Sequence, residues 1–133
     1  MGNKNRIVLG NITSLILHNN RKRFREKKLV VSKKKSIKIK EDHPNEAKYI
    51  EENQFQKLLD SSIGSCSYKE DGVLNLITYI EDKYILFGIS TNNFYNELTT
   101  VFKPSMRQLR RCKKSMIFFT KKDEESFKLY IKN

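Results

Sequence analysis

Two short stretches of the sequence hold residue types that can act on a phosphate ester. One is "KIKEDHP" at residues 38–44, and the other is "TTVFKPSMR" at residues 99–107. Imidazole and ammonium groups can transfer protons, hydroxyl groups donate hydrogen bonds, and guanidinium groups hold phosphate oxygens in pairs. The candidate catalytic residues are Lys40, His43, Thr100, Lys103 and Ser105.

The acidic residues argue against a metal-dependent reaction. They include no Asp-x-Asp pair of the kind that two-metal nucleases use, and the two Cys and two His match no zinc-site spacing. We therefore expect chemistry without a metal or other cofactor. RNA suits such chemistry because it carries its own nucleophile, the 2′-hydroxyl. The protein need only remove that proton, protonate the leaving oxygen and stabilise the added charge on phosphorus.

Each candidate also has an ordinary structural explanation, and the sequence leaves both interpretations open. A histidine before a proline, such as His43, more often begins a helix than it catalyses a reaction. Thr100 fits a strand by propensity alone, and Ser105 is placed to cap the helix that follows Pro104.

Positive charge is concentrated in two blocks. The 133 residues include 27 Lys and Arg against 15 Asp and Glu, a net charge of +12. Residues 1–40 carry +12, residues 41–102 carry −7 and residues 103–122 carry +8. If the fold brings the basic blocks together, they form a positive groove suited to a phosphate backbone. Otherwise one block is a solvated arm. The candidate nucleic-acid-binding residues are Lys38, Arg107, Arg110, Arg111, Lys113 and Lys114, whereas Lys132 near the acidic C-terminal segment is expected to contribute little.

The chain length predicts a single domain, 1–133, with a basic N-terminal extension at 1–35 and a core at 36–133. Residues 7–17 have mixed apolar spacing that leans towards a helix, and residues 21–28 read as a basic arm. The alternation at residues 36–40 predicts a strand on which Lys38 and Lys40 share one face.

The rest of the chain predicts helices followed by a sheet. A helix begins at Pro44, and a break at 52–53 allows Asn53 to cap a second short helix. A loop at 64–72 precedes strands at 73–81, 84–91 and 98–103, a basic helix after Pro104, a strand at 115–119 and a C-terminal helix. The predicted fold class is α+β, with N-terminal helices packed on a small twisted antiparallel sheet.

The cysteine content and the hydropathy of the chain bear on the cellular compartment in which the protein acts. Cys66 and Cys112 are too few for a disulfide framework, so both thiols are expected to be reduced, with Cys112 the more exposed. No apolar run approaches the length of a membrane span, and no segment has the pattern of a secretory signal. These features predict a cytoplasmic protein with no membrane partner.

Three segments together resemble a known superfamily. They are "EDHPNEAKYIEENQFQKLLD", "NLITYIEDKYILFGIS" and "LTTVFKPS", and the similarity covers roughly residues 36–120. Their order is similar to that of the barnase–EndoU–colicin–RelE superfamily of small metal-independent ribonucleases, closest to its phage- and toxin-associated branches. In that superfamily the sheet is strongly twisted and RNA lies across it.

The resemblance implies a role for each candidate. His43 or Lys40 would be the group on the helix side, Thr100 the strand hydroxyl, and Lys103, Ser105 or Arg107 the donors to the phosphate. Many members carry a second His or Tyr near the last strand, but no histidine follows Thr100 here. Either Lys or Arg takes the role of that residue, as in the RelE-like members, or the protein is no longer an enzyme.

Three functional hypotheses follow. The first is a toxin or mobile-element ribonuclease that cleaves RNA, such as tRNA, to a 2′,3′-cyclic phosphate in the cytoplasm of the host or target cell. An acidic antitoxin or immunity protein would then be its partner. The second is a non-catalytic nucleic-acid-binding protein, and the third is an assembly protein that contacts packaged nucleic acid or ribosomal RNA.

Overall fold

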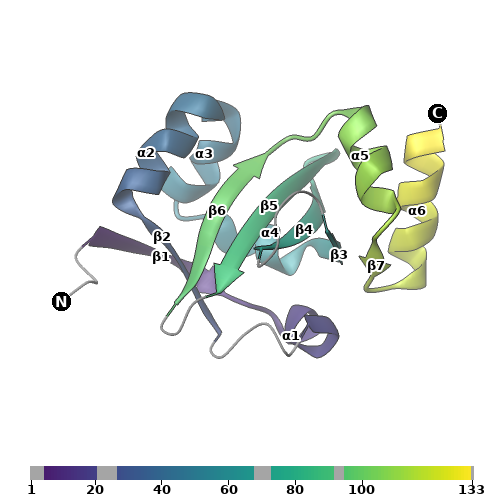
Figure 1. The fold of residues 1–133 in the computed structure, drawn as a ribbon, viewed down its shortest axis with the longest axis horizontal. Coiled ribbons are helices and arrows are strands. Elements are labelled where there is room, and N and C mark those ends of the chain that lie inside the picture. Colours follow the sequence, from purple (N-terminus) through teal and green to yellow (C-terminus); the bar gives the residue numbers. More distant parts are fainter. Residues whose placement is uncertain (1–4, 21–26, 68–72, 92–94, 133) are drawn as a thin grey trace.

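The computed structural model describes residues 5–20, 27–67, 73–91 and 95–132, and Figure 1 shows how their elements are arranged. Most of the predicted basic arm at 21–28 and the second part of the loop predicted at 64–72 lie outside the described residues. The described part contains one sheet with helices on both of its faces.

The sheet has seven strands in the order β1-β2-β6-β5-β4-β3-β7. The strands are β1 (Arg6–Asn11), β2 (Lys28–Ser32), β3 (Ser62–Cys66), β4 (Val73–Ile80), β5 (Lys83–Thr91), β6 (Asn96–Phe102) and β7 (Ile117–Phe118). Strands β3 to β6 form a continuous antiparallel meander. Only the β2–β6 pair is parallel among the described strands, and it joins Leu29 and Val30 to Asn96 and Glu97.

Two groups of helices cover opposite faces of the sheet. The helices are α1 (Ser14–Asn20), α2 (Lys33–Asp42), α3 (Pro44–Glu51), α4 (Phe55–Asp60), α5 (Met106–Lys113) and α6 (Lys121–Lys132). Helices α1 to α4 share one buried apolar cluster with the sheet, and α5 and α6 share another. Figure 1 shows α2 and α3 on one side of β6 and α5 and α6 on the other.

The alternation of β4 and β5 produces these two clusters. Leu76 and Phe87 are cross-strand partners and face α1–α4, while their neighbours Ile77 and Leu86 face α5 and α6. Both strands are therefore buried on both faces, which explains their nearly continuous apolar sequence.

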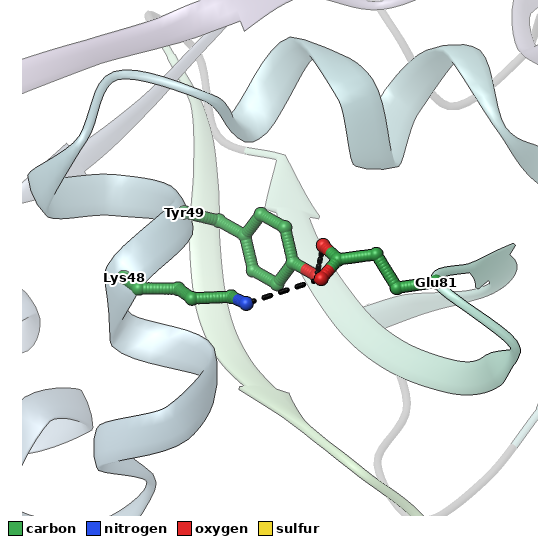
Figure 2. A network of polar contacts seen from close by, with 3 residues as sticks. All are labelled: Lys48, Tyr49 and Glu81. Atoms are coloured by element: carbon green, nitrogen blue, oxygen red, sulfur yellow. Dashed lines mark hydrogen bonds and ion pairs between the residues drawn. The ribbon is translucent and has the colours of Figure 1, made fainter.

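The hairpin between β4 and β5 is fastened to α3 at its turn. The Tyr49 hydroxyl donates to Glu81 Oε2 at 2.6 Å, and Lys48 Nζ lies 3.2 Å from Glu81 Oε1. Figure 2 shows both side chains reaching Glu81 from the same helix. The turn residues Glu81 and Asp82 have φ values of 53° and 62°, so the turn has both central residues in the left-handed region.

Several sequence predictions about this fold are confirmed. The structure is mixed α+β, the hairpin and the third strand are present, and the helical region after Pro44 breaks at residues 52–54. Asn53, however, has a φ of 55° and ends the preceding turn, so it does not cap α4. The loop predicted at 64–72 overlaps a strand, because Ser62–Cys66 pairs with β4.

The predicted strand at residues 36–40 is wrong, since this segment lies in α2. Ser32 begins the helix by accepting a hydrogen bond from the Lys35 amide at 3.0 Å. Ile39 is buried while Ile37 is 62% exposed, as expected on a helix with one contact face and not on a half-buried strand. Lys38 and Lys40 therefore lie on different sides of α2.

The predicted helical tendency of residues 7–17 is confirmed only in its second part. Residues 6–11 form β1, and α1 begins at Ser14. Because β1 pairs with β2 and β2 pairs with β6, part of the region 1–35 belongs to the sheet. The sheet is thus larger than predicted, and two of its strands precede α2.

Both described cysteines are buried. The prediction that Cys112 is the more exposed thiol is wrong, because Cys112 is fully buried against β3. Both thiols are free, and a hydrogen bond with Cys112, together with burial, raises the pKa of Cys66. Within the described ranges, no helix is both long and apolar enough to cross a membrane.

Candidate nucleic-acid-binding and cleavage site

His43 lies at the corner between α2 and α3. Pro44 disfavours helical backbone in the residue before it, so α2 ends here and α3 begins with Pro44 at its first position. The His43 amide donates to the Ile39 carbonyl at 2.6 Å, and its own carbonyl accepts from Glu46 and Ala47. These backbone bonds fix the corner and leave the half-buried ring to a side-chain contact.

That contact is with Phe102 at the end of β6. The two ring centroids are 5.6 Å apart and the ring planes differ by 30°, a stacked arrangement. Helices α2 and α3 both contact β6, whose edge is no longer paired with β2 beyond Glu97. The two stretches that carry the candidate residues therefore meet at the His43–Phe102 stack.

Thr100 lies two residues before Phe102 on the same strand. Alternate residues of a strand face the same side, about 7 Å apart, so Thr100 and Phe102 point to the same face of the sheet, the one covered by α5 and α6. His43 reaches the Phe102 ring from the corner between α2 and α3. Thr100 pairs with Gly88, and a bulge in β6 adds Thr99 at this position. A Cβ on Gly88 would lie only 2.7 Å from Thr99 Oγ1, so the absence of a side chain at Gly88 makes room for that hydroxyl.

The chain then passes through Lys103 and Pro104 into α5. Ser105 begins this helix with a capping box, in which Ser105 Oγ accepts from the Gln108 amide and Gln108 Oε1 accepts from the Ser105 amide. The structural explanation of Ser105 is thus correct. Lys103 and Arg107 flank the cap, are exposed, and form no ion pair with any described residue.

An ion pair with a carboxylate argues against Lys40 as a catalytic base. Lys40 Nζ lies 2.9 Å from Glu51 Oε2, which links α2 to α3. The hydrogen bond and the negative charge of Glu51 raise the pKa of Lys40. A lysine that acts as a general base needs a lowered pKa, so the shift is in the opposite direction.

Lys38 lies on another side of α2. It pairs with Asp42 at 3.4 Å and lines a hollow of about 460 Å³ together with Ser32, Lys34, Lys35, Ile37 and Glu41. Its ion pair is exposed and therefore weak, so a phosphate can compete for the ammonium. The structure nevertheless places Lys38 apart from Lys40 instead of on a shared face.

The remaining basic candidates lie on α5. Leu109 and Cys112 are buried against the sheet, which leaves the cations of this helix on its exposed side. Arg110, Lys113 and Lys114 line a hollow of about 630 Å³ together with Lys128, Ile131 and Lys132 of α6. Arg111 is also exposed on α5 but does not line this hollow.

The structure therefore divides the predicted site residues into groups. Thr100 and Phe102 lie on one face of β6, His43 stacks on Phe102 from the α2–α3 corner, and Lys103, Ser105 and Arg107 follow directly along the chain. Sequence reasoning did not assign roles to Phe102, Gly88 or Thr99. The Thr-x-Phe pattern at 100–102 was the available signal for Phe102, whereas the bulge that positions Thr99 has no local signature.

Among the described residues, no three His, Cys, Asp or Glu side chains are grouped so that they could hold a metal ion. Comparison with models of protein families, with curated proteins and with solved structures found no match.

Proposed function

We propose that this protein is a metal-independent ribonuclease whose cleavage site lies at the end of β6, where Phe102 meets the corner between α2 and α3. The observation that carries the proposal is the stacking of His43 on Phe102. It places an imidazole next to the strand that carries Thr100 and next to the segment that carries Lys103 and Arg107. One phosphate must contact the base, the acid and the charge stabiliser at once, so such convergence is required of any site of this kind.

The order of the elements supports the proposal. Helices α2 to α4 precede the antiparallel meander β3 to β6, and the basic helix α5 follows. This order agrees with the resemblance to the barnase–EndoU–colicin–RelE superfamily, in which RNA lies across the sheet. On that analogy, RNA crosses β6 on the face that carries Thr100 and Phe102.

The proposed reaction is the attack of an RNA 2′-oxygen on the adjacent phosphorus. His43 takes the 2′-hydroxyl proton as the new oxygen–phosphorus bond forms. Lys103 and Arg107 stabilise the added negative charge, and Thr100 donates a hydrogen bond to a phosphate oxygen. The bond to the 5′-oxygen then breaks, this oxygen takes a proton from the Lys103 ammonium, and a 2′,3′-cyclic phosphate remains.

The roles of the other candidates follow from their contacts. The Glu51 ion pair makes Lys40 an unsuitable base, so we assign the proton transfer to His43. Ser105 supports the site by starting α5, since its Oγ accepts from the Gln108 amide. The positive end of the α5 dipole then points towards the segment that carries Lys103 and adds to the attraction for phosphate.

The test is incubation of the purified protein with total RNA in EDTA. Discrete fragments with 2′,3′-cyclic phosphate ends are expected from the wild type but not from His43→Ala. The matched control is His18→Ala, which removes the exposed histidine of α1. Intact RNA with the wild type, under conditions in which RNA binds, would exclude the enzyme.

A second candidate function is non-catalytic binding of nucleic acid. It is favoured by the hollow between α5 and α6, whose five cations belong to other segments than the His43 corner. Such a protein would bind RNA with strong salt dependence but leave it intact. The same RNA experiment separates the two functions.

A further inference from the structure

The hollow between α5 and α6 is lined almost entirely by cations. Its volume is about 630 Å³, and the residues around it are Arg110, Lys113, Lys114, Lys128, Ile131 and Lys132. No carboxylate is among the described residues that line it. Lys132, near the acidic C-terminal segment, was expected to contribute little to nucleic-acid binding, but it lines the same hollow as the cations of α5.

Little within the described structure neutralises these charges. Lys128 pairs with Glu124 at 2.6 Å, but Lys113, Lys114 and Lys132 form no ion pair with a described residue. Arg110 and Lys114 are four residues apart at the end of α5, a spacing at which like charges destabilise a helix. A bound anion would relieve this repulsion.

One of the cations is held in place by the fold. Arg110 Nε donates to the Ile131 carbonyl at 3.2 Å, so the guanidinium bridges α5 and the end of α6. This bond uses one of the five N–H donors of arginine, and the terminal nitrogens hold the other four. A guanidinium fixed in this way is suited to paired contacts with phosphate oxygens.

We infer that the hollow between α5 and α6 is a second phosphate-binding site, which holds the backbone of the same RNA strand beyond the cleavage site. This inference rests on the proposed function, because it assumes that RNA is the substrate. Ser105 and Lys113 are eight residues apart on α5, or about 12 Å along the helix axis at 1.5 Å per residue. The two sites therefore contact phosphates of different nucleotides.

The inference is tested with two double variants and two lengths of RNA. Lys113→Ala with Lys132→Ala removes two cations of the hollow, and Lys121→Ala with Lys122→Ala removes two exposed cations from the other end of α6. All four residues are exposed, so both variants should fold, which circular dichroism can check. The probes are a long single strand and a dinucleotide, both methylated on their 2′-oxygens so that neither is cleaved.

The expected result depends on the length of the RNA. Fluorescence anisotropy should show at least a tenfold loss of affinity for the long strand in the hollow variant, with a salt slope reduced by about 1.4 for two single-strand phosphate contacts. The control variant should lose less, and the dinucleotide should bind all three proteins equally. Equal losses in both variants, or no loss in the hollow variant, would overturn the inference.

Two further measurements separate this inference from the proposed function. Cleavage of an unmethylated dinucleotide in EDTA reports only on the cleavage site. If the wild type leaves this dinucleotide intact while the hollow variant still loses affinity for the long strand, the proposed enzyme is contradicted and the phosphate site is supported. Binding of inorganic tripolyphosphate tests whether the hollow binds a free polyphosphate instead of the RNA backbone. If the hollow variant loses tripolyphosphate binding but keeps its affinity for the long strand, the hollow serves a free polyphosphate and the inference is wrong.

Discussion

The imidazole ring of His43 stacks on the ring of Phe102, with centroids 5.6 Å apart and planes at 30°. The contact joins the corner between α2 and α3 to the last residue of β6. Phe102 also packs against the apolar cluster under α5, so the ring that supports His43 is itself held by the core. His43 is therefore positioned by the fold while its backbone closes the corner.

If His43 transfers a proton during RNA cleavage, His43→Ala should lower the cleavage rate by about 10²–10⁴-fold, the usual contribution of a general acid or base. RNA affinity should change little, because the positive charge of the surface comes from Lys and Arg. The rate is measured with a labelled RNA in EDTA, and His18→Ala serves as the control. A His43→Ala variant that cleaves at the wild-type rate would assign the proton transfer to another group.

Phe102 should act as a positioning residue. Phe102→Leu keeps an apolar side chain against α5 but removes the stacking surface, so we expect a stability cost below about 1.5 kcal/mol. The cleavage rate should fall through kcat, and the pH dependence of kcat should shift because the environment of the imidazole changes. An unchanged pH profile with a lower rate would mean that Phe102 has only a structural role.

Arg107 should contribute to RNA binding more than a cation on the opposite layer does. Arg107 is exposed at the start of α5, whereas Lys57 is exposed on α4 across the sheet. Arg107→Glu should lower RNA affinity and reduce the salt slope by about 0.7 per lost single-strand phosphate contact. Lys57→Glu makes the same change in net charge, so equal effects of both variants would mean that charge acts only in bulk.

The β4–β5 hairpin, β6 and the start of α5 could be predicted because the signals are local. The β4–β5 hairpin has apolar runs on both sides of a two-residue turn, and Ser105 with Gln108 has the spacing of a capping box. These features depend on neighbours within a few residues. The two segments of the candidate site were chosen from local residue types as well, and their role stays a prediction.

Other features depend on tertiary contacts that a single sequence does not reveal. Ile37 and Ile39 have the spacing of strand residues. The segment forms a helix because Ser32 caps it and because Ile39 is buried while Ile37 is exposed. The parallel pairing of β2 with β6 joins residues more than 60 positions apart. Lys132 lines the α5–α6 hollow because α6 packs near α5, a tertiary contact that its own sequence segment does not indicate.

The contact between Tyr49 and Glu81 should make stability depend on pH. The hydrogen bond from Tyr49 is the largest cause that lowers the pKa of Glu81, and the hydrogen bond from Lys48 is the next. The Glu81 carboxylate therefore stabilises the fold above its unfolded pKa. This contribution is lost as the pH falls through the folded pKa. Burial and Glu81 raise the pKa of Tyr49, so its contribution is lost as the pH rises above the unfolded tyrosine pKa of about 10.

Tyr49→Phe tests this contact. It should cost about 1 kcal/mol near neutral pH, at the low end for a bond to a charged group because solvent screens the carboxylate. The cost should shrink in acid, as measured by urea unfolding between pH 3 and pH 7. Glu81→Gln should remove the same acid dependence, and an equal cost of Tyr49→Phe at both pH values would contradict the coupling.

The turn that contains Glu81 should be more stable with glycine than with alanine at its second position, residue 82. Asp82 has a φ of 62°, where a side chain with a Cβ atom costs about 1–2 kcal/mol. Glycine avoids that cost but loses about 0.5–1 kcal/mol through the entropy of the unfolded chain.

Asp82→Gly and Asp82→Ala remove the same carboxylate, and only alanine keeps the Cβ. We therefore expect the glycine variant to be more stable by about 0.5–1 kcal/mol in urea unfolding with unchanged m values. An alanine variant of equal or greater stability would show that this turn relaxes out of the left-handed conformation.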